Sequence, residues 1–120
     1  MDIRRAMPVI TTSHPAETRK FYEGLLGFRT AMDEDGMLML ASPSNPTTQM
    51  IVAWASETAA DPELVSVDVS IEVADVDAAY VRAKADGLEI VRDIRDEQWG
   101  IRRFFLRDPA GQIINIASHI

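Results

Sequence analysis

The sequence predicts an α+β fold of two βαβββ modules, which form a curved, cup-shaped mixed sheet with helices on its outer face. A short pattern occurs twice, at residues 45–52 and again at 108–115. Upstream of each copy, a β-rich run leads into a helix-like stretch that ends at a glycine, Gly27 or Gly87. A repeat of this kind indicates duplicated supersecondary units. Most expected strands are joined by short turns, which excludes a doubly wound parallel sheet.

The length of 120 residues fits one domain with a core of its own. Module one is expected at residues 1–56 and module two at 65–120, with the small, acidic segment 57–64 as the linker. Each half would be marginally stable alone, because so short a chain buries little surface. We therefore expect the halves to share sheet contacts, either within one chain or between partner chains.

In module one, residues 3–12 form the expected first strand, and a helix begins near Ser13-His14-Pro15. Phe21, Leu25 and Phe28 have the spacing of a single buried helix face. The turn at residues 33–36 has the composition of a hairpin. The remaining strands are expected at about 28–33, 36–42 and 48–55.

Module two contains the clearest strand pattern. Apolar residues alternate with polar ones at a period of two from Ser66 to Val73. A helix follows, with Asp75 as its N-cap and Gly87 at its end. Further strands are expected near 88–95, 101–107 and 112–118.

Composition excludes several classes of function. No cysteine is present, so disulfides, thiolate catalysis and cysteine metal sites are ruled out. The net charge of −7 argues against a nucleic-acid partner. Neither a secretory signal nor a membrane-spanning run is visible. We expect a cytoplasmic protein without membrane association.

The stretch FYEGLLGF at residues 21–28 and the stretch DPAG at 108–111, within the repeated βαβββ order, resemble the vicinal oxygen chelate superfamily. This superfamily includes glyoxalase I, extradiol dioxygenases and the bleomycin-resistance proteins. The resemblance implies two modules, from one chain or from the partner chains of a dimer, that form a cup around a cavity. In the enzymes, four side chains from related strands hold a divalent metal.

Matching the motifs assigns those four positions to Met7, Val52, Asp68 and Asn115. Only Asp68 would bind a hard or borderline divalent ion well, and Val52 cannot ligate at all. His14 opens a helix and His119 lies near the end of the chain, so neither completes the set. We therefore expect no metal, no cofactor and no catalytic residue of the metal-dependent type. The sequence is most similar to the metal-free branch typified by the bleomycin-resistance proteins.

Strand alternation predicts which side chains line the cup. Three questions stay open: whether Trp54 stacks on a ligand or is buried at a dimer seam, whether Trp99 is a lid or a plug, and which neighbouring arginine faces inward. The predicted ligand-binding residues are Met7, Val9, Met50, Val52, Trp54, Asp68, Ser70, Glu72, Trp99, Arg102, Arg103 and Asn115.

The sequence thus predicts a homodimeric small-molecule binding protein without a catalytic metal, for a ligand that is antibiotic-like, aromatic or cationic. An alternative is a metal-dependent enzyme of the same superfamily, such as a lyase, isomerase, dioxygenase or thiol transferase. A third is a subunit whose fold serves only protein association.

Overall fold

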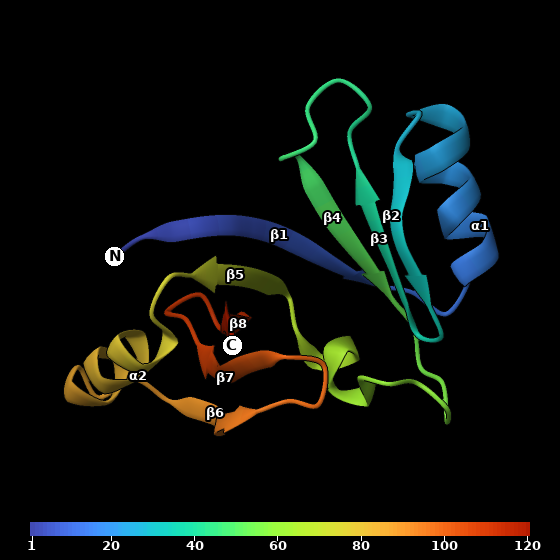
Figure 1. Cartoon of the computed structure of the whole chain (residues 1–120). Coiled ribbons are helices and arrows are strands. Elements are labelled where there is room, and N and C mark those ends of the chain that lie inside the picture. Colours follow the sequence, from blue (N-terminus) through green and yellow to red (C-terminus); the bar gives the residue numbers. More distant parts are fainter. The chain divides into compact units, whose positions relative to one another are not determined.

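The computed structural model describes all 120 residues, and the order βαβββ occurs in it twice (Figure 1). The fold class is mixed α+β, as predicted. The first set of elements is β1 (Ile3–Thr11), α1 (Pro15–Arg19), the π-helical segment η1 (Lys20–Leu25), β2 (Arg29–Glu34), β3 (Met37–Ala41) and β4 (Gln49–Ala53). After the 3₁₀ segment η2 (Pro62–Ser66) come β5 (Val69–Val73), α2 (Val76–Ala85), β6 (Ile90–Asp96), β7 (Ile101–Arg107) and β8 (Ile113–His119).

The chain forms two compact units. Unit 1 consists of residues 1–6 and 67–120, and unit 2 of residues 7–66. Strand β1 begins in unit 1 and ends in unit 2, so one boundary falls within this strand, between residues 6 and 7, and the other falls between residues 66 and 67, shortly before β5.

Unit 2 is a sheet with the strand order β2-β3-β4-β1. The β2–β3 and β3–β4 pairs are antiparallel, while β1 and β4 run parallel. Figure 1 shows α1 alongside these strands. The core consists of the buried residues Leu38, Leu40, Met50 and Val52, against which Tyr22, Phe28 and Trp54 pack.

The first helix presents a different face to the core than the sequence predicts. Phe21 is 50% exposed and Leu25 is 70% exposed, whereas Tyr22 and Phe28 pack against the core. The prediction assumed a helix period of 3.6 residues. Residues 20–25 adopt the wider π-helical winding, which changes the direction in which successive side chains point.

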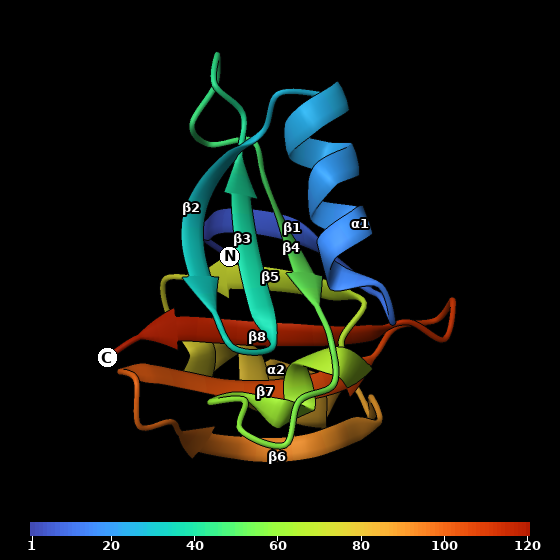
Figure 2. The ribbon, with the colours of Figure 1, turned by 90° about the vertical axis from the view of Figure 1, so that its right-hand side faces the viewer.

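Unit 1 contains the strand order β5-β8-β7-β6, with β5 and β8 parallel and the other pairs antiparallel. Helix α2 covers one face of these strands, and Figure 2 shows it behind β7 and β8. Tyr80 of α2 makes an edge-to-face contact with Phe104, with ring centroids 5.2 Å apart. The buried core residues are Val73, Val76, Ala79, Ala83 and Phe104.

The boundaries of α2 follow the predicted signals. The Asp75 side chain accepts a hydrogen bond from the Ala78 N–H at 3.0 Å, as an N-cap does. Gly87 follows the helix with a φ of 72°. The preceding strand is shorter than predicted, because β5 begins at Val69 and residues 62–66 form η2.

Candidate functional site

Unit 1 has a polar face on the side of its strands away from α2. Ile71, Phe104 and Ile116 pack in the α2 core. Their neighbours along the chain point to the other side, since side chains alternate along a strand. We call this second surface the Asn115 face; it carries Ser70, Arg103, Phe105 and Asn115.

Two polar side chains meet at the centre of the Asn115 face. Ser70 and Asn115 are register partners on β5 and β8. The Asn115 Nδ2 donates a hydrogen bond to the Ser70 Oγ at 3.0 Å. Asn115 is 5% exposed, and its Oδ1 is buried with no hydrogen-bond partner. The Asn115 face therefore contains a buried hydrogen-bond acceptor, Oδ1 of Asn115, to which no group of the protein donates.

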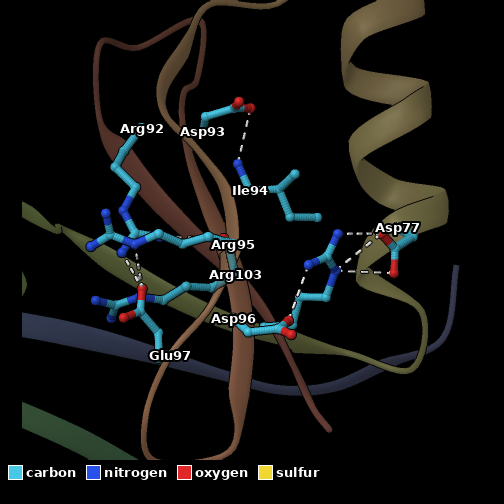
Figure 3. Close-up of polar contacts among 9 residues, drawn as sticks. Asp77, Arg92, Asp93, Ile94, Arg95, Asp96, Glu97 and Arg103 are labelled. Carbon is cyan, nitrogen blue, oxygen red and sulfur yellow. Dashed lines mark hydrogen bonds and ion pairs between the residues drawn. The ribbon is translucent and has the colours of Figure 1, made fainter.

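Beside this pair, the Glu97 carboxylate contacts three arginines of the β6–β7 hairpin (Figure 3). The Glu97 Oε1 accepts hydrogen bonds from the Arg103 Nε at 3.2 Å, from the Arg95 Nε at 3.3 Å and from the Arg92 Nη2. Burial raises the pKa of Glu97, but the Arg92 hydrogen bond and the charges of Arg103 and Arg92 outweigh burial and hold this pKa below its usual range.

The guanidinium groups also lie against aromatic rings. The Arg103 Cζ is 5.0 Å from the centroid of the Phe105 ring and 5.2 Å from that of Trp99. The Arg92 Cζ lies 5.2 Å from the Phe105 centroid. Phe105 is itself the register partner of Asn115 across β7 and β8. Cation–π contacts thus join the arginine cluster to the aromatic residue next to the unsatisfied amide.

Residues 4–116 match the sequence profile of the Glyoxalase/Bleomycin resistance protein/Dioxygenase superfamily. The chain belongs to this superfamily. The match spans both copies of the βαβββ order, in agreement with the fold.

Solved structures share this superfamily fold. A superfamily member from Vibrio splendidus 12B01 has a TM-score of 0.69 at 16% identity, covering 98% of this chain and 99% of that one. Methylmalonyl-CoA epimerase from Mycobacterium tuberculosis has a TM-score of 0.70 at 17% identity, over 99% and 88% of the two chains. A hypothetical protein from Bacillus halodurans C-125 reaches 0.76 at 13% identity, over 100% and 96%. No curated protein matches the chain.

The positions that the superfamily resemblance assigns to a metal do not fit a divalent ion here. Met7 and Val52 are buried apolar side chains, and Asn115 could offer a single neutral oxygen. The Asp68 Oδ2 accepts a hydrogen bond from the Ile113 N–H at 2.8 Å, which fixes the start of β8. No three His, Cys, Asp or Glu side chains are grouped so that they could hold a metal ion.

The fourth-strand residues face the opposite way from the prediction. Val9 of β1 is the register partner of Ile51, whereas Met50, Val52 and Trp54 pack on the helix side with Tyr22 and Phe28. Met7 and Val9 are both buried. The strand alternation is as expected, but the register is shifted by one residue, so Ile51 occupies the place in unit 2 that Asn115 has in unit 1.

Trp54 nevertheless borders a groove of about 470 Å³ in unit 2. The groove lies where β1 and β4 end, and its other walls are Thr11, Thr12, Ser13, Pro15, Ala55 and Val65. The Thr11 Oγ1 donates to the Val65 carbonyl at 3.2 Å across it. This groove belongs to unit 2 and contains none of the other predicted site residues.

The two neighbouring arginines have different roles. Arg103 is 3% exposed and lies on the Asn115 face. Arg102 instead binds Asp77 at the start of α2, with its Nε 3.1 Å from Oδ1, and its Nη1 donates to Asp96 at 3.0 Å. These two carboxylates raise the pKa of Arg102 above its ordinary value. Trp99, against which Arg103 stacks, is 46% exposed.

Glu72 has partners on both sides. The Arg5 Nη2 lies 2.8 Å from its Oε2, and the His119 Nδ1 lies 3.7 Å from its Oε1. This carboxylate is therefore held by cationic or imidazole groups of the protein itself. Because Glu72 and His119 lie far apart in the sequence, their contact was not predicted.

Sequence reasoning missed Arg92, Arg95, Glu97 and Phe105. Arg92 and Arg95 are three positions apart, so simple alternation would place them on opposite faces of the sheet. The β6–β7 register shifts between these two residues, and both side chains reach Glu97. The available signal was the group of four arginines that flank this hairpin turn, two on each strand.

Proposed function

We propose that the protein is a small-molecule binding protein of the Glyoxalase/Bleomycin resistance protein/Dioxygenase superfamily that works without a catalytic metal. The observation that carries this proposal is the chemistry of the four metal positions. Met7 offers a thioether, Val52 has no atom that can bind a metal, and Asn115 offers a neutral amide. The fourth position, Asp68, is a carboxylate that already accepts a hydrogen bond from the backbone.

The Asn115 face supplies what a binding site needs instead. Ligand sites are mostly apolar with a few placed polar groups. Here the exposed Trp99 ring provides aromatic surface, Phe105 is buried beneath the guanidinium groups, and Arg103, Ser70 and Asn115 provide polar anchors. The site recognises its ligand by shape, aromatic contact and hydrogen bonds.

The proposed partners are one small-molecule ligand and a second copy of the chain, in the cytoplasm, with resistance to an antibiotic-like compound as one outcome of ligand capture. The net charge of −7 argues against nucleic acid and is compatible with a cationic ligand. No helix of the protein is long and apolar enough to cross a membrane.

The second candidate is a metal-dependent enzyme of the superfamily. A fold shared with methylmalonyl-CoA epimerase favours it. Such an enzyme would need ligands beyond those that the motifs assign, because Lewis-acid chemistry requires a secure set of three or four with an open position.

A thermal-shift screen of aromatic, cationic and antibiotic-like compounds, run in the presence of a chelator, tests the proposal. We expect at least one compound to raise the melting temperature in a concentration-dependent way, since a ligand that binds only the folded state stabilises it. Binding that occurs only after a divalent ion is added would favour the enzyme instead. A screen without any stabilising compound, with or without metal, would contradict both.

A further inference from the structure

The unsatisfied amide oxygen of Asn115 indicates which chemical group the site recognises. We propose that Asn115 and Ser70 together bind a carboxamide group of the ligand, an inference that rests on the proposed binding function. The Oδ1 of Asn115 is the buried side-chain polar atom without a hydrogen-bond partner. Leaving such an acceptor unpaired is destabilising, and most buried polar groups in native proteins are paired.

Ser70 supplies the complementary donor. Its hydroxyl accepts the hydrogen bond from the Asn115 Nδ2, which leaves the hydroxyl proton to donate elsewhere. An acceptor and a donor therefore lie on adjacent side chains. A carboxamide carries an N–H and a C=O side by side and matches both: its N–H donates to Asn115 Oδ1 and its carbonyl accepts from Ser70 Oγ. A carboxylate lacks the N–H, and an ammonium group lacks the acceptor.

The surroundings indicate what the carboxamide is attached to. Phe105 is the register partner of Asn115, and Ala117 follows two residues later on the same side of β8. The Phe105 ring is covered by the guanidinium groups of Arg92 and Arg103. The accessible aromatic ring beside them is that of Trp99, which is 46% exposed and stacks on Arg103, and a flat aromatic body would stack on this ring. The ligand class is therefore an aromatic or heteroaromatic carboxamide.

Binding requires a side chain to move, because Asn115 Oδ1 is buried. The side chain placed to move is Trp99, which lies in the turn between β6 and β7, is exposed, and stacks on Arg103. We expect association slower than ordinary docking for this reason.

Calorimetric titration with benzamide tests the inference, with benzoate as the matched probe that lacks the N–H. We expect the wild-type protein to bind benzamide at least about tenfold more tightly than benzoate. Asn115→Leu should lose at least about tenfold in benzamide affinity while keeping or raising thermal stability, because it removes a buried unpaired group. Ser70→Ala should weaken benzamide binding as well, and it provides a second variant if Asn115→Leu does not fold.

Two results would overturn the inference: wild-type protein that does not bind benzamide at millimolar concentration, or Asn115→Leu and Ser70→Ala variants that bind it unchanged. These failures differ from failure of the proposed function. If other compounds of the chelator screen still bind, the carboxamide assignment is wrong and the binding function stands. If no compound binds, the binding function itself is wrong.

Discussion

At the scale of single residues, Glu97 organises the chemistry of the Asn115 face. Its carboxylate contacts Arg92, Arg95 and Arg103, and two of these guanidinium groups cover Phe105. The side chains of Glu97 and Arg103 are 9% and 3% exposed. Because both charges lie away from water, their pairing offsets part of the free-energy cost of burying them.

Replacing Glu97 with Gln should destabilise the protein by about 3 kcal/mol, since it removes the carboxylate charge that contacts Arg92, Arg95 and Arg103. Urea unfolding at neutral pH measures the change. Glu89→Gln is the matched control, because Glu89 pairs with Arg107 at the surface, with the two side chains 62% and 41% exposed. The control should change stability by less than about 1 kcal/mol. Equal effects of the two substitutions would contradict the role of Glu97.

The pKa of Glu97 also predicts a pH dependence. The folded-state pKa lies below the unfolded one, so the stabilisation by Glu97 is fully present above the unfolded value of about 4.3 and is lost as the pH falls through the folded value. The stability difference between wild type and Glu97→Gln should be constant from pH 7 to about 5 and shrink below about pH 4. A difference that grows on acidification would contradict this assignment.

At the scale of elements, local signals predicted the ends of helices better than their faces. Asp75 and the two glycines Gly27 and Gly87 were correctly assigned, because capping and positive φ are local requirements. The outward turn of Phe21 was not predictable from a helical period, since the π-helical winding depends on packing. The predicted orientation of the Val52 side chain was wrong for a similar reason. The register between β1 and β4 is set by pairing across the sheet.

Asp75→Ala should lower the stability by about 1 kcal/mol through loss of the hydrogen bond to the Ala78 N–H. Thermal unfolding followed by circular dichroism measures the loss. Asp86→Ala, at the other end of α2, removes an exposed pair with Arg82 and should have a smaller effect. An Asp75→Ala variant as stable as the wild type would show that the cap does not hold the helix.

Gly24 and Gly36, two of the three glycines of unit 2, should respond oppositely to alanine. Gly36 has a φ of 86°, and an added Cβ would lie 2.8 Å from the Ala59 Cβ, so Gly36→Ala should be destabilising by at least about 1 kcal/mol. Gly24 lies in the helical segment with no atom nearer than 3.9 Å to an added Cβ. Gly24→Ala should stabilise by up to about 1 kcal/mol. Denaturant midpoints that shift in the same direction for both variants would contradict this account.

At the scale of the whole molecule, the two repeats share an order of elements but not a chemistry. In unit 2 the register partners are the apolar residues Val9 and Ile51, whereas in unit 1 the corresponding partners are the polar residues Ser70 and Asn115. The repeated pattern in the sequence revealed the duplicated fold, because it reflects backbone turns and strands. It could not show which side chains lie beside the Ser70–Asn115 pair, since Phe105 and the Arg103–Glu97 contact belong to one hairpin and are not part of the repeated pattern.

The metal content of the purified protein tests the central claim most directly. Inductively coupled plasma mass spectrometry after gel filtration, without added metal or chelator, should find far less than one Zn, Fe, Ni or Mn per chain. Addition of these ions should leave the melting temperature unchanged, because no side-chain set is available to bind them in the folded state. One tightly held divalent ion per chain, lost together with thermal stability on chelation, would contradict the account.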